Sequence, residues 1–340
     1  MMSAPGDDWR KLRFNAGLNH IESVGYYMLF AEYAPKPSHI NRLKGKSAMQ
    51  ELAIDPDLDL GVAIARQADA DSLLCWTCGT CDSECPVFRS TERLRPQETV
   101  RMANLGMIED LLKAPQIWYC LSCRRCVQGC PNRVKPYELH RHLQHEAIAT
   151  GVISSEMIAP YRKLFIEFQR VRWRVAAHCF KAPLEAMPSQ LWYKWLKTPL
   201  RQSGYYISET VLPSGQMPRL LPSQDDGKAC FTCSECSTCC PIFGERNVFD
   251  PQRIIRMANL GLDDQVLKSP SIWLCLGCRR CTDYCTQLVR GHDIIRRFQD
   301  EAIAKGVVDP WYPNRLLEAD RLIYPRFLDE IDALLGLYAA

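Results

Sequence analysis

Residues 75–86 of the chain read CWTCGTCDSECP, and residues 120–131 read CLSCRRCVQGCP. The same spacing returns at residues 230–241, CFTCSECSTCCP, and at residues 275–286, CLGCRRCTDYCT. Sixteen of the 18 cysteines in this chain of 340 residues therefore fall into four copies of the pattern C-x₂-C-x₂-C-x₃-C. The remaining composition, 47% hydrophobic and 24% charged, is that of a globular protein with room for two domains. The clustered cysteines are thus the feature that a functional hypothesis has to explain.

The cellular compartment is indicated by the way the cysteines are used. A secreted disulfide scaffold is typically a short chain with an export signal. The N-terminal residues MMSAPGDDWRKLRFNAGLNH carry charges throughout and contain no apolar signal segment. No uncharged apolar run approaches the roughly 18–20 residues that span a bilayer. We therefore expect a protein of a reducing, cytoplasmic compartment, in which clustered cysteines usually bind metal.

The net charge argues against nucleic acid as a partner. The formal charge of +3 is too small for a nucleic-acid-binding surface, and it counts every thiol as neutral. If sixteen thiolates hold four [4Fe–4S] clusters, each cluster with its ligands contributes about −2, and the loaded protein carries about −5. The sequence pI of 8.1 therefore does not describe the working form.

An internal repeat with an offset of 155 residues organises the chain, because adding 155 to each motif cysteine of the first half gives a motif cysteine of the second. Residues 96–126, PQETVRMANLGMIEDLLKAPQIWYCLSCRRC, match residues 251–281, PQRIIRMANLGLDDQVLKSPSIWLCLGCRRC, without a gap. The match extends to EAIATGV at 146–152 and EAIAKGV at 301–307. The chain is a tandem duplication, and we expect each half to be one folding unit.

The 34 residues between the two motifs of each half have a helical pattern. Pro96 and Pro251 suit the first turn of a helix, and Pro115 and Pro270 mark its end. Apolar residues at helical spacing lie between these prolines: Val100, Ala103, Met107 and Leu111 in the first half, and Ile255, Ala258, Leu262 and Val266 in the second. The segments at 136–150 and 290–305 are again charged and helical in pattern. The predicted fold class is all-α.

The segment between the two halves is rich in basic residues. Residues 160–201 contain two acidic residues, Glu167 and Glu185. The same segment contains nine basic residues: Arg162, Lys163, Arg170, Arg172, Arg174, Lys181, Lys194, Lys197 and Arg201. An apolar stripe at helical spacing runs through the same segment: Leu164, Phe168, Val171 and Val175. Three interpretations stay open, namely a solvated basic helix packed on its own domain, a docking site for a protein partner, or a peripheral contact with a membrane surface.

The motif has the form expected for [4Fe–4S] clusters. Two-residue spacers let three consecutive thiolates point inward from a tight loop, and in two-cluster ferredoxins the fourth cysteine, which precedes a proline, binds the other cluster. This logic predicts four ligand sets: Cys75, Cys78, Cys81 and Cys130; Cys120, Cys123, Cys126 and Cys85; Cys230, Cys233, Cys236 and Cys285; and Cys275, Cys278, Cys281 and Cys240. The exchange of one cysteine holds the clusters of a pair close together and makes cluster assembly part of folding.

Other uses of these cysteines fit the pattern less well. Structural zinc takes four ligands per ion, and a run of four cysteines within eleven residues suits it poorly. Disulfides do not suit a reducing compartment. A radical enzyme would leave one iron without a cysteine ligand, whereas every predicted cluster here has a fourth sulfur.

Two cysteines remain outside the predicted sets. Cys239 stands where the first half has Glu84. Cys240 matches Cys85 and, like it, precedes a proline, so Cys240 is the predicted ligand and Cys239 a bystander. Cys179 in the connecting segment is expected to be a buried small hydrophobic residue.

Charged residues near the motifs allow more than one interpretation. Four arginines lie inside the cysteine loops, where they either favour the reduced cluster or are plain solvated residues: Arg124, Arg125, Arg279 and Arg280. Three histidines follow the first half's second motif: His140, His142 and His145. Their counterparts in the second half are Ile295, Arg297 and Asp300. Because no counterpart is a histidine, we expect a solvated helix face rather than a metal site.

The paired CxxCxxCxxxCP motifs, separated by a helical stretch, resemble the α-helical ferredoxin domain of the C subunit of heterodisulfide reductase. The lead-in at residues 55–86, DPDLDLGVAIARQADADSLLCWTCGTCDSECP, is especially similar to that C subunit. The resemblance covers roughly residues 55–150 and 225–310. It implies a relay of electrons between the flavin-bearing A subunit of such a complex and its catalytic B subunit, which is of the CCG type. This chain departs from the family by carrying two such units in tandem.

The resemblance also implies the domain organisation. Two α-helical dicluster ferredoxin domains are expected at residues 54–151 and 225–310, each with two [4Fe–4S] clusters. An N-terminal helical extension is expected at 1–53, the basic helical connector at 152–224, and a C-terminal helical tail at 311–340.

An iron–sulfur subunit with its own catalytic activity, of the glycolate or lactate oxidase or anaerobic dehydrogenase type, is the main alternative. Such oxidase subunits carry CCG-type domains, and Cys239-Cys240 followed by Cys275 and Cys278 mimics half of that pattern. No lone cysteine precedes Cys239 at the required distance, and no G-x-G-x-x-G or G-x-x-x-x-G-K-[ST] motif predicts a nucleotide, nicotinamide or flavin site. A regulatory iron–sulfur protein would need a nucleic-acid surface. We therefore predict a non-catalytic electron-transfer subunit of a redox complex.

Overall fold

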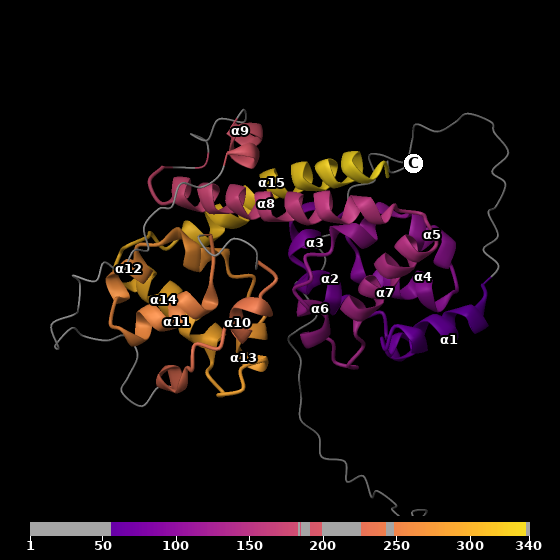
Figure 1. The fold of residues 1–340 in the computed structure, drawn as a ribbon, viewed down its shortest axis with the longest axis horizontal. Coiled ribbons are helices and arrows are strands. Elements are labelled where there is room, and N and C mark those ends of the chain that lie inside the picture. The colour runs from indigo at the N-terminus through magenta and orange to yellow at the C-terminus, as the bar shows by residue number, and fades with distance from the viewer. Residues whose placement is uncertain (1–55, 183, 185–190, 199–225, 243–247, 338–340) are drawn as a thin grey trace, which may run out of the picture. The chain divides into compact units, whose positions relative to one another are not determined.

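The computed structural model describes residues 56–182, 184, 191–198, 226–242 and 248–337, which belong to one compact unit running from Asp55 to Ala340 (Figure 1). Helices form its regular structure, and no strand occurs among the described residues. The predicted all-α fold class is confirmed. The helical extension predicted at residues 1–53 lies outside the described part of the chain.

The two halves share a series of short helices that occur in the same order. The first half contains α1 (Leu58–Gln67), a 3₁₀ turn (Ser72–Leu74), α2 (Thr80–Glu84), α3 (Pro86–Thr91), α4 (Pro96–Asn104), α5 (Ile108–Lys113), a 3₁₀ turn (Pro115–Tyr119), α6 (Arg125–Gln128) and α7 (Pro136–Ala149). The second contains a 3₁₀ turn (Asp226–Ala229), α10 (Glu235–Thr238), α11 (Pro251–Asn259), α12 (Asp263–Leu267), a 3₁₀ turn (Pro270–Leu274), α13 (Arg280–Asp283) and α14 (Gly291–Ala304). The helices α4, α6 and α7 match α11, α13 and α14 at the 155-residue offset. The repeat in the sequence is therefore also a repeat in the structure.

The helix predicted between the motifs is interrupted in both halves. α4 and α11 begin at the expected prolines, but each ends after nine residues and is followed by a second short helix. Gly106 has a φ of +75°, and a Cβ atom there would overlap with the backbone oxygen of Asp57. Because this position needs a left-handed backbone and a close approach, glycine ends the helix there. The predicted stripe is still buried at Val100, Ala103 and Leu111.

The helices α7 and α14 confirm the helical pattern that follows each second motif. The predicted solvated face is wrong for His140, which is 1% exposed, as is its counterpart Ile295. This position belongs to the core in both halves, whereas His145 is exposed. Burial lowers the pKa of His140 to about 4, because the imidazolium form is poorly solvated there.

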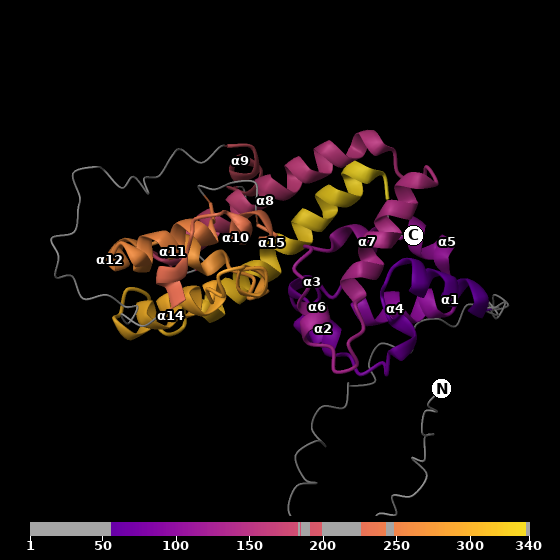
Figure 2. The same ribbon diagram turned by 60° about the horizontal axis from the view of Figure 1, so that its bottom comes forward.

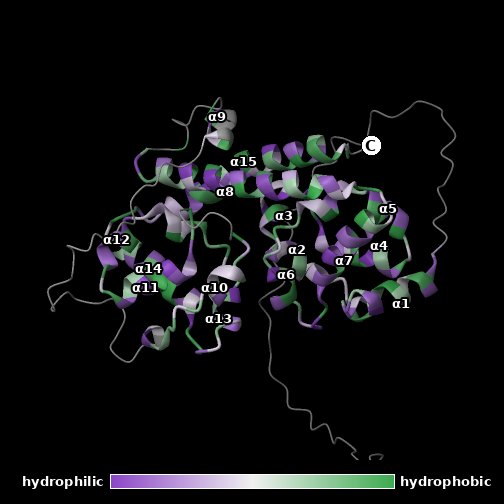
Figure 3. Ribbon diagram, viewed as in Figure 1, coloured by the Kyte–Doolittle hydropathy of each residue, from purple (hydrophilic) through white to green (hydrophobic). Residues whose placement is uncertain are grey.

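Two long helices follow the two halves. The connector forms a 3₁₀ turn (Ser155–Met157), α8 (Ile158–Cys179) and α9 (Leu191–Lys197), and the C-terminal tail forms α15 (Tyr312–Leu335). Hydrophobic and hydrophilic residues alternate along α8 and α15 (Figure 3). The predicted stripe of α8 is buried at Leu164, Phe168, Val171 and Val175. Arg172 of the basic connector is buried too, so this helix is not a fully solvated one.

Each long helix touches both halves. The Tyr161 hydroxyl of α8 donates to the Trp118 carbonyl of the first half at 2.7 Å, and α8 also packs against the Pro270–Leu274 turn of the second. α15 leaves the second half and packs against α3 of the first (Figure 2). There, Asp332 of α15 accepts hydrogen bonds from Arg93 at 2.5 Å and from the Tyr119 hydroxyl at 2.7 Å. The long helices therefore tie the halves together.

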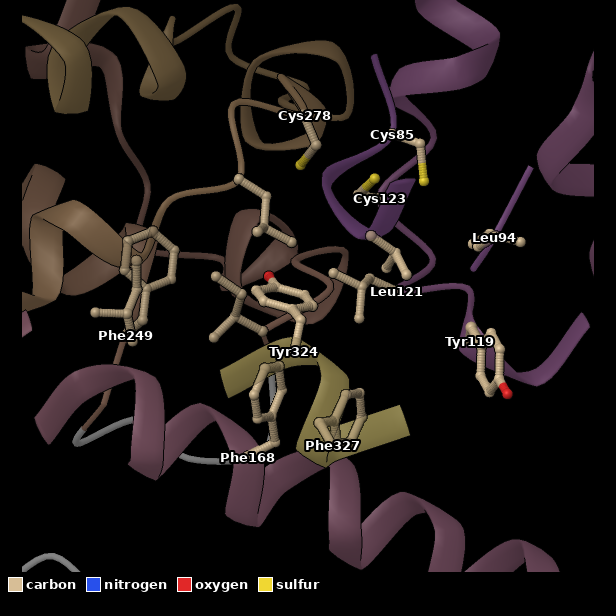
Figure 4. Close-up of a cluster of buried hydrophobic side chains, with 14 of the residues drawn as sticks. Cys85, Leu94, Tyr119, Leu121, Cys123, Phe168, Phe249, Cys278, Tyr324 and Phe327 are labelled. Atoms are coloured by element: carbon tan, nitrogen blue, oxygen red, sulfur yellow. The ribbon is translucent and has the colours of Figure 1, made fainter. Parts of the chain in front are cut away.

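The crossing of α8 and α15 is built from aromatic rings (Figure 4). Phe168 of α8 stacks on Phe327 of α15 with ring centroids 4.0 Å apart, and the Tyr324 ring meets Phe168 edge-on at 5.0 Å. Such ring pairs contribute about 0.5–1.5 kcal/mol in addition to the free energy of burying their apolar surface.

None of the helices in the described ranges is long and apolar enough to cross a membrane.

Candidate metal centres

The four cysteine motifs share one backbone conformation. In each motif the residue before the second cysteine and the residue after it have positive φ; the eight positions are Thr77, Gly79, Ser122, Arg124, Thr232, Ser234, Gly277 and Arg279. Six of these are not glycine, so residue type alone did not indicate this strained geometry. The turn directs backbone amides at sulfur: the Thr77 and Thr232 amides each donate to the sulfur of the first motif cysteine at 3.4 Å. Amides directed in this way stabilise negative charge on the sulfur.

Pockets in the structure bring together cysteines from neighbouring motifs. We name four groups: the first outer set (Cys75, Cys78, Cys81 and Cys130), the first inner set (Cys85, Cys120, Cys123 and Cys126), the second inner set (Cys240, Cys275, Cys278 and Cys281) and the second outer set (Cys230, Cys233, Cys236 and Cys285). Three of these sets line pockets with about 360, 310 and 360 Å³ of empty space, for the first outer, second inner and second outer sets respectively. Each pocket therefore contains the exchanged cysteine of its predicted set, and the pocket of the second outer set is also lined by Cys281 of the second inner set.

The first inner set is recognised from the mutual influence of its thiols. Burial is the main cause that raises the pKa of Cys126 well above its usual range. Cys120, Cys123 and Cys85 of the same set raise it further, as does Cys81 of the first outer set. The pKa of Cys85 rises to about 12, again mainly through burial and also through Cys123. Cys85 is therefore close to Cys123 of the motif at 120–131, and Figure 4 shows the two side chains next to each other.

The inner sets are more enclosed than the outer sets. Cys78 and Cys233 are exposed, whereas Cys85, Cys123, Cys278 and Cys281 are buried. Hydrogen bonding to Thr80 lowers the pKa of Cys78, while burial raises that of Cys275 to about 11. Buried thiols of this kind stay protonated unless a bound cation compensates the thiolate charge, so iron binding and proton release are coupled.

Cationic and polar groups around the inner sets fit a negatively charged occupant. The positive charge of Arg280 acts against the burial that raises the pKa of Cys278, and Arg172 acts in the same way on Cys275. The Tyr324 hydroxyl and the Arg172 Nε are buried and have no hydrogen-bond partner among the described residues. Tyr324 is close enough to Cys123 and Cys85 for both to raise its pKa, in addition to the main effect of burial. An acceptor such as cluster sulfide would satisfy such donors.

The spaces enclosed by the sets differ from single-ion sites. In the described ranges, no three His, Cys, Asp or Glu side chains converge closely enough to hold one metal ion. Zinc would draw thiolates to about 2.3 Å from one point. The residues present fit four four-iron clusters, which would supply reversible one-electron chemistry at these positions.

The two remaining cysteines take the places expected of them. Cys179 is 1% exposed at the end of α8, which confirms that it is a buried residue. Cys239 is half-buried, and its thiol donates to the Cys236 carbonyl at 3.5 Å. Cys240, by contrast, lines the pocket of the second inner set. The assignment of Cys239 as a bystander therefore stays a prediction that this geometry supports.

The arginines inside the cysteine loops join the two halves, which sequence reasoning missed. Arg125 Nη1 donates to the Leu276 carbonyl at 3.1 Å, and Arg280 Nη1 donates to the Ser122 carbonyl at 3.1 Å. Nε2 of Gln128 donates to the Cys278 carbonyl at 2.8 Å. The CRRC sequence, which occurs in both halves, could have predicted this contact, because arginines repeated in both loops suit a contact between the two repeats.

A family described as a 4Fe-4S dicluster domain matches residues 71–134 and 226–289. Each half therefore contains a segment similar to this dicluster domain. Each match begins just before the first cysteine motif of its half and ends just after the second. The long helices α8 and α15 therefore lie outside the matched segments. The tandem arrangement predicted from the repeat is confirmed.

The chain is similar to the C subunits of heterodisulfide reductases. The C subunit of H(2):CoB-CoM heterodisulfide,ferredoxin reductase from Methanothermobacter thermautotrophicus is 34% identical over 86 residues, which cover 25% of this chain and 46% of the relative. A protein of Archaeoglobus profundus, described as like the heterodisulfide reductase C subunit, is 34% identical over 107 residues, covering 30% and 57% respectively. The C2 subunit of H(2)/formate:CoB-CoM heterodisulfide,ferredoxin reductase from Methanococcus maripaludis is 37% identical over 95 residues, covering 28% and 50%. The chain spans about half the length of the curated relatives it matches.

Proposed function

We propose that this chain is an electron-relay subunit of a heterodisulfide reductase-like complex, with four [4Fe–4S] clusters held by the two outer and two inner sets. The observation that supports this proposal is that three pockets are each lined by one complete predicted ligand set, including the cysteine exchanged from the neighbouring motif. A complete set of thiolates leaves no iron open for a substrate. The arrangement therefore suits electron storage and passage better than catalysis on a bound molecule.

The surroundings of the outer sets support exchange with larger partners. Trp76 and Phe231 occupy the same position in the two repeats, beside the first cysteine of each outer set. Their exposed fractions are 75% and 72%. Exposed aromatic side chains beside exposed Cys78 and Cys233 give each outer set an apolar surface of the kind that anchors protein partners.

We propose two partners for the relay, a flavin-bearing protein that resembles the A subunit of heterodisulfide reductase and a CCG-type protein that resembles its B subunit. The relatives' names place them in such reductases. A reducing compartment such as the cytoplasm suits sixteen unpaired thiols. The Arg172 side chain is buried in the core, so a membrane contact of the basic connector is not part of this proposal.

Anaerobic iron and sulfide analysis tests the cofactor content. We expect about sixteen iron and sixteen sulfide per chain, from four clusters of four. About eight iron, or stoichiometric zinc, would contradict the four-cluster assignment.

Reconstitution with partners tests the relay. The isolated chain should accept electrons from a strong reductant and pass them to an artificial acceptor, but it should not turn over a disulfide, a 2-hydroxy acid or a thioester. Addition of the CCG-type partner should confer substrate reduction. Steady turnover of a natural substrate by the chain alone would favour an intrinsic enzyme instead.

A further inference from the structure

The two inner sets lie next to each other although they belong to different halves. Cys123 of the first inner set and Cys278 of the second are side by side, with Cys85 beside Cys123 (Figure 4). Nε2 of Gln128, which follows Cys126 in the first half, donates to the Cys278 carbonyl at 2.8 Å, so the two motif loops are in direct contact. Each outer set, in contrast, contains one exposed cysteine, Cys78 in the first half and Cys233 in the second.

The contact that brings the inner sets together is made by corresponding residues of the two repeats. Arg125 and Arg280 are counterparts, and each donates from Nη1 to a backbone carbonyl in the other half's second motif loop at 3.1 Å. Reciprocal contacts between counterparts are the mark of a two-fold relationship, as in a symmetric dimer. The two halves therefore use one surface twice, and that surface is the loop holding three cysteines of each inner set.

The long helices fix this contact from below. Tyr324 of α15 is fully buried, and its ring lies beneath the loops that carry Cys123 and Cys278 (Figure 4). Arg172 of α8 donates to the Leu274 carbonyl, next to Cys275, and lies over the Tyr324 ring at 6.0 Å. α8 and α15 pack on each other through the aromatic crossing, and each touches both halves, so together they hold the halves that carry the two loops.

We propose that the four ligand sets form one unbranched series through the chain, in the order first outer, first inner, second inner and second outer, with Arg125 and Arg280 as positioning residues at its centre. This inference rests on the four-cluster occupancy proposed above. The series has two ends, each at an exposed outer set. It therefore provides a separate surface for an electron donor and for an electron acceptor at opposite ends of the path.

Magnetic interaction between the inner sets tests the proposal. The fully reduced chain is measured by electron paramagnetic resonance as wild type, as Arg125→Ala/Arg280→Ala and as Arg279→Ala. Arg279 is the matched control, because it lies in the same loop, carries the same charge and is exposed. We expect about sixteen iron in all three proteins, with slower spin relaxation and narrower lines in the double variant only. Unchanged spectra in a fully loaded double variant would overturn the proposed junction.

A cross-link provides a second readout that does not depend on the arginine variants. In a Cys239→Ser background, Gln128→Cys/Asp283→Cys places thiols at the junction, since these side chains are 2.9 Å apart. The control pair, Arg133→Cys/Leu288→Cys, uses exposed counterparts that follow the outer-set cysteines. A short bismaleimide should link the first pair at least tenfold more than the second. Equal yields, or no link in the first pair, would overturn the inference.

The two experiments separate this inference from the proposed function. About eight iron per chain in the wild type would show that the four-cluster relay itself is wrong. About sixteen iron without a cross-link at Gln128 and Asp283 would leave the relay standing and remove only the central junction.

Discussion

Gln128 and Asp283 occupy the same position in the two repeats and are hydrogen-bonded to each other, with Nε2 of Gln128 donating to Oδ2 of Asp283 at 2.9 Å. A residue meets its own counterpart only near an axis of two-fold symmetry. Two carboxylates at this point would repel, whereas an amide and a carboxylate form a donor–acceptor pair. The repeats thus differ at a position where identical acidic residues would disfavour the contact.

The attachment of α15 to the first half should depend on Asp332. Asp332→Ala leaves the buried Tyr119 hydroxyl without its acceptor and removes one carboxylate from Arg93, which should cost about 2–3 kcal/mol of unfolding free energy. Asp329→Ala is the control, because its exposed side chain pairs with the same arginine and should cost less than about 1 kcal/mol. Chemical denaturation of the anaerobic protein measures both. Equal losses of unfolding free energy in the two variants would show that the buried contact with Tyr119 contributes nothing to stability.

The exchanged cysteine can be tested by single substitutions. Cys85→Ser should damage the cluster of the first inner set and spare that of the first outer set, because Cys85 lies with Cys120, Cys123 and Cys126. Iron analysis with electron paramagnetic resonance distinguishes the two losses. Cys239→Ser is the matched control at the Cys-Cys pair and should leave the iron content unchanged. Loss of a cluster in that control would show that Cys239, and not Cys240, is the ligand.

The hydroxyl of Tyr324 should tune the inner sets. Hydrogen bonds to cluster sulfur favour the reduced state, so Tyr324→Phe should lower the reduction potential of at least one inner cluster without changing the iron content. Tyr312→Phe is the control, since its hydroxyl already donates to the Ala176 carbonyl at 2.9 Å. Spectroscopic redox titration provides the measurement. Equal potentials in the Tyr324→Phe variant and the wild type would mean that the hydroxyl does not reach the cluster.

The exposed aromatic residues of the outer sets should govern partner binding. Trp76→Ala and Phe231→Ala should each leave stability within about 0.5 kcal/mol of wild type, because the side chains are exposed. Each should weaken binding of one partner protein by about tenfold, or about 1.4 kcal/mol, and spare the other. The affinity of each variant is measured by its binding to each co-purified partner, with the partner immobilised on a surface. If both substitutions weaken the same partner, the two ends do not serve different proteins.

Acid sensitivity should depend in part on His140. Its pKa is about 4 in the folded protein against about 6.5 when unfolded, so folding keeps the imidazole neutral. The stability that depends on neutral His140 is complete above pH 6.5 and is lost as the pH falls toward 4. Between pH 7.5 and 5.5 the wild type should lose about 1 kcal/mol more than His140→Ile, which copies Ile295. Parallel losses in both proteins would contradict the burial argument.

Some features of this protein follow from local sequence alone. The cysteine spacing predicted four ligand sets, and the 155-residue repeat predicted two equivalent units with helices at the same positions. Proline placement located the starts of α4 and α11. These features depend on neighbouring residues, whose backbone preferences are the same wherever the segment lies in the fold.

Tertiary structure decided the features that depend on residues far apart in the chain. The burial of His140, the break at Gly106 beside Asp57 and the contacts of α15 with the first half each need a partner from a distant segment. From the sequence, Arg125 and Arg280 were equally consistent with solvated surface residues. In the structure, each donates to a backbone carbonyl of the other half at 3.1 Å. Spacing within a motif keeps its first three sulfurs close together, because the loop is short. Only the packing of one repeat against the other fixes which sets are neighbours, because the chain between them is long enough to allow many arrangements.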